Sequence, residues 1–135
     1  MMGPKLTYLA VLLLAINCIN IGFSDNACNN DHDLAITKDR GNMVAVTEKC
    51  GRSCLAKRAC TTRCIMQLSH LKQPCAECYS DEVHCTAINC VASCMLRPKS
   101  QSCFDCSEKF CGQAMRSCTG LDTHLTIPYN VVEDV

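Results

Sequence analysis

Cysteine is the feature of this chain that most limits how it can fold. The 135 residues include 15 cysteines, and only Cys18 lies among the first 24 residues, so fourteen remain in residues 25–135. This density in a short chain is typical of a scaffold held together by disulfide bonds, and an even number allows every cysteine to be paired. Because disulfides persist only in oxidising compartments, we expect the protein to work outside the cytosol.

The first 24 residues have the organisation of a secretory signal peptide. Lys5 is the only charge in them, an unbroken apolar run of eight residues follows at 9–16, and the small residue Ser24 precedes the expected cleavage point. The run is too short to span a bilayer, which takes about 20 apolar residues, and no later segment is longer. The sequence therefore predicts a secreted, extracellular protein of residues 25–135 that does not insert into membranes.

The charge balance argues against some classes of partner. Without Lys5, 12 Lys and Arg residues stand against 13 Asp and Glu residues. Nucleic-acid binders and membrane-lytic peptides both need a strong positive excess, which is missing here. We therefore expect no nucleic acid among the partners.

Three segments have the spacing of cysteines and apolar residues that is typical of helices, at residues 47–71, 76–96 and 103–118. Pro98 follows the second segment and Gly120 follows the third, and both residue types commonly end a helix. No segment shows the sustained alternation of a strand. The predicted fold class is all-α, a small disulfide-rich helical hairpin repeat of about three helices, in which two consecutive hairpins share the middle helix.

Irregular arms are predicted on both sides of this cysteine-rich helical domain, which is assigned to residues 47–120. Residues 25–46 are polar and punctuated by Asn, Asp and Gly, which favour turns. We expect them to form an N-terminal arm tied down by Cys28, with a loop or short strand at 43–46. Residues 121–135 are predicted to be a C-terminal tail.

Two stretches of the chain resemble each other. CTTRCIMQ at 60–67 precedes PCAECY at 74–79, and CVASCMLR at 90–97 precedes SCFDCS at 102–107. CGRSCL at 50–55 is a third, partial copy of the pair of cysteines four residues apart. The pattern favours a duplicated unit, and chance recurrence of helical spacing is the alternative.

Helix geometry limits how these cysteines can be paired. Residues four apart on a helix have Cβ atoms about 5–6 Å apart, whereas a disulfide needs about 3.8 Å, so each pair must bond outward to another element. The pattern is similar to the disulfide-linked helical hairpins of small secreted peptides.

In an antiparallel hairpin, the residue numbers of bonded partners have a nearly constant sum. This rule suggests four bonds, with sums of 145, 142, 201 and 200: Cys60–Cys85, Cys64–Cys78, Cys90–Cys111 and Cys94–Cys106. The remaining six cysteines are left unassigned: Cys28, Cys50, Cys54, Cys75, Cys103 and Cys118.

Two C-x2-C pairs, at residues 75–78 and 103–106, raise two other interpretations. Four thiolates in this order are one pattern of a zinc site, and a single C-x2-C at a helix start is the pattern of a thioredoxin-like redox centre. The ten other cysteines compete with zinc, and no strand flanks the pairs as a redox fold requires. We therefore predict structural disulfides, with no metal and no cofactor.

No arrangement of residues predicts catalysis. The four histidines, His32, His70, His84 and His124, are scattered, and none belongs to a hydrolase or metalloprotease motif. Asp31 and Asp33 flank His32, but the spaced oxygen ligands of a calcium loop are missing, so a solvated turn is expected there. The sequence favours a protein that is not an enzyme.

The expected function is binding of an extracellular partner, a receptor or a channel, as toxins, pheromones and host-interaction effectors do. A rigid cross-linked scaffold loses little conformational entropy when it binds. The candidate contact residues are basic and lie on the helix faces away from the cysteines: Arg52, Lys57, Arg58 and Arg63.

Two other functions fit the same sequence. The first is a carrier of a small apolar ligand, which predicts a lined internal pocket, whereas a solid core would argue against it. The second is a structural or defensive coat protein that simply persists outside the cell. This second function predicts self-association without saturable binding.

Overall fold

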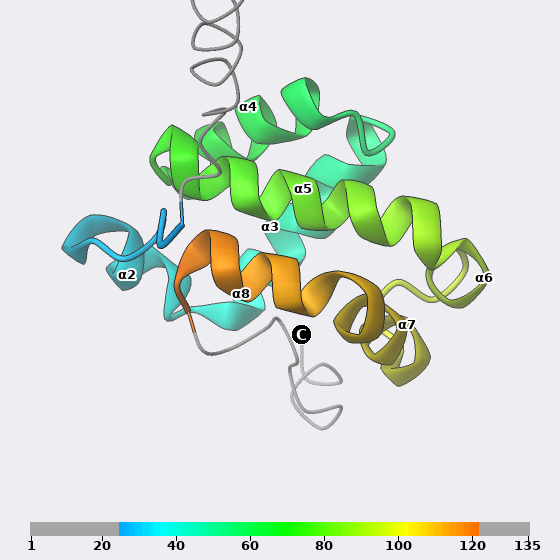
Figure 1. Cartoon of the computed structure of the whole chain (residues 1–135). Coiled ribbons are helices and arrows are strands. Elements are labelled where there is room, and N and C mark those ends of the chain that lie inside the picture. The colour runs from blue at the N-terminus through cyan, green and yellow to red at the C-terminus, as the bar shows by residue number, and fades with distance from the viewer. Residues whose placement is uncertain (1–24, 122–135) are drawn as a thin grey trace, which may run out of the picture.

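The computed structural model describes residues 25–121, and this part of the chain contains helices and turns but no strand (Figure 1). The predicted signal peptide at 1–24 and the tail beyond residue 121 lie outside the described residues. The helical elements follow one another with short connections: α2 (Asp31–Thr37), α3 (Arg40–Ser53), α4 (Arg58–Ser69), α5 (Gln73–Asn89), α6 (Val91–Cys94), α7 (Gln101–Ser107), the π-helical turn η1 (Glu108–Gly112) and α8 (Gln113–Thr119). The all-α, disulfide-rich class is confirmed, whereas the repeat of about three helices is not.

The N-terminal arm is ordered and largely helical, unlike the predicted irregular segment. Asn30 caps α2 by accepting a hydrogen bond from the backbone N–H of Asp33. The buried carboxylate of Asp33 accepts another from the backbone N–H of Lys72, 3.0 Å away, which fastens α2 to the start of α5. Asp39 caps α3 in the same way, so residues 43–46 are helical, and the side chains of Met43, Val44 and Val46 are buried.

The first predicted helix, 47–71, is divided into the end of α3 and the whole of α4. Leu55 and Ala56, with φ of 52° and 54°, both adopt the left-handed conformation. Two such residues in succession cannot continue a right-handed helix, and the chain reverses there. Residues other than glycine seldom adopt this conformation, so neither Gly nor Pro marked the turn, and only a slip in the helical spacing between Cys54 and Cys60 indicated a break, near residues 57–59.

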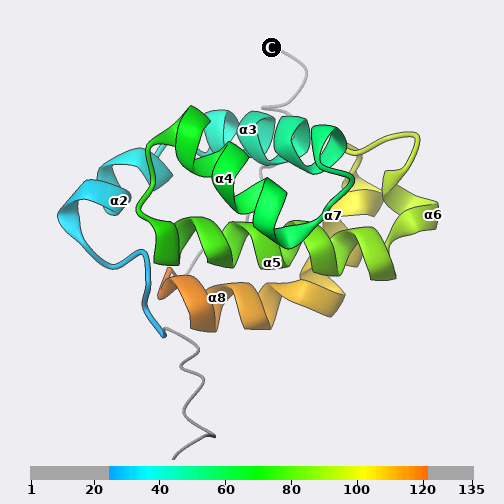
Figure 2. The ribbon, with the colours of Figure 1, turned by 90° about the horizontal axis from the view of Figure 1, so that it is seen from above.

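The long helix α5 lies at the centre of the molecule, between α4 on one side and α8 on the other (Figure 2). Pro74 stands in its first turn, where the missing N–H costs nothing. The chain then breaks at Cys90, forms the short α6, and returns antiparallel to α5 through α7, η1 and α8. The structure is therefore two helical hairpins, α3–α4 and α5–α8, laid side by side.

All fourteen cysteines of residues 25–121 form disulfides. Two bonds cross the α3–α4 hairpin, four cross the α5–α8 hairpin, and one fastens the N-terminal arm to α5: Cys50–Cys64 and Cys54–Cys60; Cys78–Cys118, Cys85–Cys111, Cys90–Cys106 and Cys94–Cys103; Cys28–Cys75. No C-x3-C pair is bonded to itself, as helix geometry predicted. No bond joins the two hairpins directly.

The four predicted pairings are wrong: Cys60–Cys85, Cys64–Cys78, Cys90–Cys111 and Cys94–Cys106 are each replaced by other bonds. Cys60 and Cys64 bond back to α3, because the unrecognised turn at residues 55–56 makes α3 and α4 a hairpin of their own. Cys90 and Cys94 bond forward to α7. The two C-x3-C pairs thus have opposite roles, so the bonds do not repeat as a duplicated unit would require.

The constant-sum rule itself holds, with different values. The residue numbers of bonded partners add up to 196 or 197 in the α5–α8 hairpin and to 114 in the α3–α4 hairpin. Half of 196 is 98, so the larger hairpin is centred on Pro98. In both antiparallel halves of this hairpin, two bonded cysteines are five residues apart, at 85 and 90 and at 106 and 111. The π-helical turn η1 lies in the second of these intervals. A π-helical turn is wider than an α-helical one and keeps both Cys106 and Cys111 facing α5.

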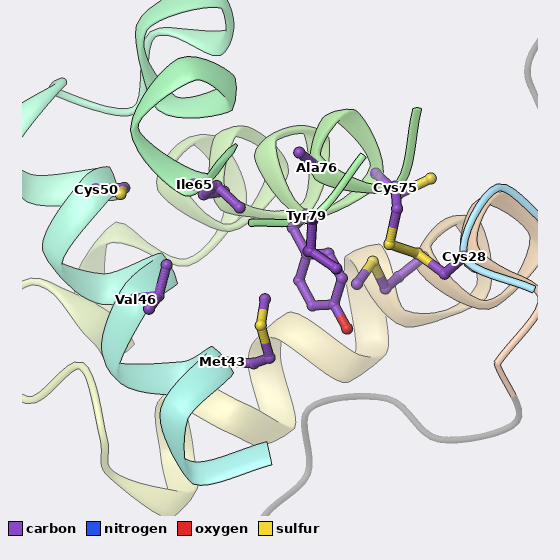
Figure 3. Packing of buried hydrophobic residues seen from close by; sticks show 11 residues of the cluster. Cys28, Met43, Val46, Cys50, Ile65, Cys75, Ala76 and Tyr79 are labelled. Carbon is purple, nitrogen blue, oxygen red and sulfur yellow. A yellow bond between two sulfur atoms is a disulfide. The ribbon is translucent and has the colours of Figure 1, made fainter. Parts of the chain in front are cut away.

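The hydrophobic core lies where α3, α4 and α8 meet the first half of α5 (Figure 3). The ring of Tyr79 lies beside Met43, and Ile65 from α4 closes the cluster from the other side. Burial, reinforced by the negative charge of Glu82, raises the pKa of Tyr79 well above its ordinary value of 10.0. We call the following residues the core cluster: Cys28, Met43, Val46, Cys50, Ile65, Leu71, Cys75, Ala76, Cys78, Tyr79 and Met115.

Candidate functional site: an apolar cleft between the two hairpins

An open cleft of about 410 Å³ lies next to the core cluster, toward the end of the molecule where α6 and α7 lie. It is lined by one face of α3, by the second half of α5, and by α6 and α7. The two hairpins therefore face each other across it. Its volume falls within the range of small-molecule binding sites.

The walls of the cleft are mostly apolar. Val44 and Val83 face it from α3 and α5, and Phe104 faces it from α7. At its mouth, Val91 and Met95 remain 50% and 65% exposed. The sequence predicts a row of apolar residues that includes these two, but they do not pack into a core. Their apolar surface is in contact with water, and a bound ligand would cover it.

A short chain of polar groups interrupts the apolar wall. The hydroxyl groups of Thr86 and Ser107 are 2.7 Å apart, and Ser107 Oγ donates a hydrogen bond to Glu82 Oε1 at 3.4 Å. All three residues line the cleft, and Glu82 is only 6% exposed. We call these three residues the polar triad. Because Glu82 and Ser107 are buried, they lie deeper than the exposed residues at the mouth.

Ion pairs surround Glu48 on the α3 side of the cleft. Glu48 Oε1 lies 3.2 Å from Arg52 Nε on the same helix. Its Oε2 lies 3.4 Å from Nζ of Lys99, which belongs to the loop between α6 and α7. The second pair connects the two hairpins, but both of its members are partly exposed, so it contributes less than about 1 kcal/mol to stability.

Glycine at position 51 sets the approach of α3 to α5 beside the cleft. A Cβ atom at Gly51 would lie 2.9 Å from Cγ1 of Val83, which is too close for ordinary contact. Gly51 and Val83 both line the cleft. The glycine therefore lets the two hairpins touch at this edge while the cavity stays open next to it.

One disulfide lies in the wall of the cleft, and two more follow it along the same hairpin. Cys94–Cys103 joins α6 to α7 in its wall, and Cys90–Cys106 and Cys85–Cys111 follow on the same hairpin. An apolar hollow tends to collapse when the elements around it are free to move. These bonds restrain α6 and α7 relative to α5, and so they oppose that collapse.

The four predicted contact residues have separate surroundings. Arg52 lines the cleft and pairs with Glu48, whereas Arg58 pairs with Asp81 of α5 at 2.7 Å. Lys57 and Arg63 are exposed on the α3–α4 hairpin. Of the four, only Arg52 belongs to the cleft.

The sequence analysis did not identify the polar triad as a site. Glu82, Thr86 and Ser107 form no short motif, because two of them come from α5 and the third from α7, 21 residues later. The available signal was a single carboxylate, Glu82, one helical turn from Tyr79 and Thr86 on the face of α5 that carries the bonded cysteines. Only the correct hairpin register brings Ser107 to that face.

The histidines and the C-x2-C cysteines have structural contacts. His32 Nε2 lies 2.9 Å from the carbonyl oxygen of His70, and His84 Nδ1 lies 3.0 Å from that of Ala56, while His124 is outside the described residues. Each cysteine of the two C-x2-C pairs is bonded to a partner elsewhere. Between residues 25 and 121, no three His, Cys, Asp or Glu side chains gather as metal ligands. None of the helices in this range has the length and apolar character of a membrane span.

Comparisons of the chain with protein-family models, with curated proteins and with solved structures find no match. The cleft is therefore the feature of the protein that points to a function.

Proposed function

We propose that the protein is a secreted, non-enzymatic binding protein whose cleft holds a small apolar ligand. The observation that carries this proposal is the apolar cleft of about 410 Å³. A concave and mostly apolar cavity with a few convergent polar groups is the usual form of a small-molecule site. Of the functions that the sequence suggested, a carrier is the one that requires such a cavity.

Secretion is supported by the seven disulfides, because so many bonds are typical of extracellular proteins. The same bonds favour a binding function over one that requires a large conformational change. A ligand that enters a cleft with restrained walls does not have to order them, so little of its interaction free energy is lost.

The fluorescent probe N-phenyl-1-naphthylamine tests the carrier function, because its emission rises in apolar surroundings. We expect saturable binding of one probe per chain. Ala87→Trp places a large ring in the cleft from an exposed position on α5, and should weaken binding by about tenfold or more. Ala114→Trp on the exposed side of α8 is the matched control and should bind as the wild type does.

Circular dichroism and thermal unfolding would establish that both tryptophan variants are folded. Emission that rises without saturation, or an equal loss of binding in the two variants, would contradict the proposal. The chain has no other tryptophan, so each variant also carries a unique reporter of probe binding.

Binding of an extracellular protein, as a toxin-like effector does, is the second candidate. It is favoured by the exposed apolar residues beside the cleft, since Leu96 is 87% exposed and Ile88 is also largely exposed. Exposed apolar patches often mark interaction surfaces. Leu96→Ser would weaken capture of such a partner and leave binding of the small probe unchanged.

A further inference from the structure

We propose that the end of the molecule around α6 docks on the surface of a lipid bilayer that contains anionic lipids. This inference goes beyond the proposed function, because it names a partner for the outer surface of the protein. One step of its argument rests on the cleft as a ligand site. We call the residues that would enter the bilayer surface the apolar tip: Ile88, Val91, Met95 and Leu96.

Exposed apolar side chains are concentrated in the apolar tip. Seven large apolar residues of the described chain are exposed, and four of them lie between residues 88 and 96. Val91 and Met95 are four residues apart in one helical turn, so they share a face of α6. Leu96 follows directly and is the most exposed of the seven. Single exposed apolar residues need no explanation, but a cluster of them marks an interaction surface.

The position of the tip favours a flat partner. Two views of the molecule both place α6 at one end, just beyond the end of α5 (Figures 1 and 2). Residues 90–96 include no charged or amide side chain. A projecting end of this composition can enter the boundary between head groups and acyl chains, where membrane-surface elements bury their apolar side chains. No helix has to cross the bilayer for this contact.

Positive charge borders the apolar tip. Arg97 and Lys99 follow it in the chain, and no Asp or Glu occurs from residue 83 to residue 104. Lys99 pairs with Glu48, whereas the exposed side chain of Arg97 has no ion-pair partner within residues 25–121. Basic residues beside a bilayer with anionic lipids are attracted to its negative surface potential. The charge next to the tip is therefore complementary to such a surface.

The apolar tip is continuous with the cleft. Val91 and Met95 belong to both, since they line the mouth of the cleft and remain exposed. If the cleft holds an apolar ligand, docking of the tip would place this mouth against the acyl chains. The ligand would then pass between protein and lipid without exposing its apolar surface to water. A bilayer therefore explains why the tip and the mouth of the cleft coincide.

Co-sedimentation of the full protein with lipid vesicles tests the inference. We expect binding to vesicles of equal parts phosphatidylcholine and phosphatidylserine to be at least about fivefold tighter than binding to phosphatidylcholine alone. Leu96→Asp places a charge where the bilayer would take up an apolar side chain, and should weaken binding to the mixed vesicles by about tenfold or more. Leu68→Asp makes the same change near the end of α4, at a residue that is 43% exposed, and should bind as the wild type does.

Arg97→Gln separates the effect of charge from that of apolar contact. This variant should bind the mixed vesicles about fivefold more weakly and keep the wild-type binding to phosphatidylcholine alone. Circular dichroism would establish that all three variants are folded. The comparison of the two vesicle compositions on the wild-type protein decides the matter even if Leu96→Asp does not fold.

Three results would overturn docking on an anionic bilayer: no binding to either vesicle, equal binding to both, or equal losses in folded Leu96→Asp and Leu68→Asp. Light scattering would then show whether a second copy covers the tip instead, as a dimer that Leu96→Asp dissociates. Titration of the naphthylamine probe without vesicles keeps the two proposals apart. Saturable probe binding without vesicle binding leaves the carrier function standing, and the reverse result leaves only the docking.

Discussion

The two ends of this molecule are held together in different ways. At the end that contains the core cluster, side chains from α3, α4, α5 and α8 fill the space between the helices. At the other end, α3, α5, α6 and α7 line an open cleft, and three further disulfides cross the α5–α8 hairpin. Since Cys28–Cys75, Cys50–Cys64 and Cys78–Cys118 cross-link the core end as well, the comparison teaches that cross-links can hold helices around a cavity that packing leaves unfilled.

This division has a thermodynamic meaning. Packing stabilises the folded state through contacts, so the loss of even one buried methylene group lowers the free energy of unfolding. A disulfide acts chiefly on the unfolded chain, and it can stabilise a region whose folded state is not filled. The core end should therefore be the more sensitive to side-chain truncation, whereas ligand binding should depend on the disulfides beside the cleft.

The largest expected effect comes from removing one disulfide at each end. Cys28→Ala with Cys75→Ala opens a bond between residues 47 apart, and loop entropy gives a loss of about 4 kcal/mol in the free energy of unfolding. Cys94→Ala with Cys103→Ala, 9 residues apart, should cost only about 2.5 kcal/mol. Binding of the naphthylamine probe should change in the opposite order, with the larger loss at Cys94–Cys103. Guanidinium unfolding and probe titration measure the two losses in both variants. If one variant lost more stability and also more probe binding than the other, the expected difference between the two ends would be contradicted.

Truncation of one apolar side chain at each end should give the next largest difference. Ile65 is completely buried in the core cluster, and Ile65→Ala should cost about 3 kcal/mol. Met95 lines the cleft and is mostly exposed, so Met95→Ala should cost less than about 1 kcal/mol. Urea unfolding measures both. Equal losses would mean that the cleft end is packed as tightly as the core.

Alkaline pH should weaken the core end. Burial and the charge of Glu82 raise the pKa of Tyr79 in the folded state, so its stabilising contribution is complete below the unfolded-state value of about 10 and is lost as the pH rises above it. Between about pH 10 and 11, this one group should lower the free energy of unfolding by about 1 kcal/mol. The slope should be smaller by this amount in Tyr79→Phe. Parallel slopes in the two proteins would show that Tyr79 ionises freely when folded.

Two glycines on α3 provide the smallest test. Gly51→Ala gains helix propensity but places a Cβ atom against Val83, and should destabilise the protein by about 1 kcal/mol. Gly41→Ala, whose nearest neighbour would be 3.8 Å away, should instead stabilise it by about 0.5 kcal/mol. Thermal unfolding of the two variants measures this difference in stability. The double variant Gly51→Ala, Val83→Ala should recover most of the loss, and its failure to do so would remove Val83 as the cause.

The sequence was sufficient to predict the helical class and the outward direction of each C-x3-C pair, because both depend on local helix geometry. The register of the hairpins depends on where the chain turns. Pro98 marks one turn, and spacings of seven and five residues on both legs of the α5–α8 hairpin were a usable signal for its pairing. Leu55 and Ala56 form the other turn, and neither residue type favours the left-handed conformation that both adopt there.

The cleft could not be predicted from periodicity. Val91 and Met95 recur at helical spacing whether they pack against a neighbour or face a hollow. The difference is decided by the separation of α3 from α6 and α7, which depends on contacts far apart in the chain. The polar triad was hidden for the same reason, since Ser107 reaches Glu82 only when the hairpin register is known.

Complete pairing of the cysteines in residues 25–121 also affects how the bonds persist. Reshuffling begins when a thiolate attacks a bonded sulfur. This part of the chain supplies no thiolate, so its connectivity changes only when a thiol arrives from outside. In surroundings poor in free thiols, the chain would keep the same sulfur partners through repeated heating and cooling and would regain the same shape each time.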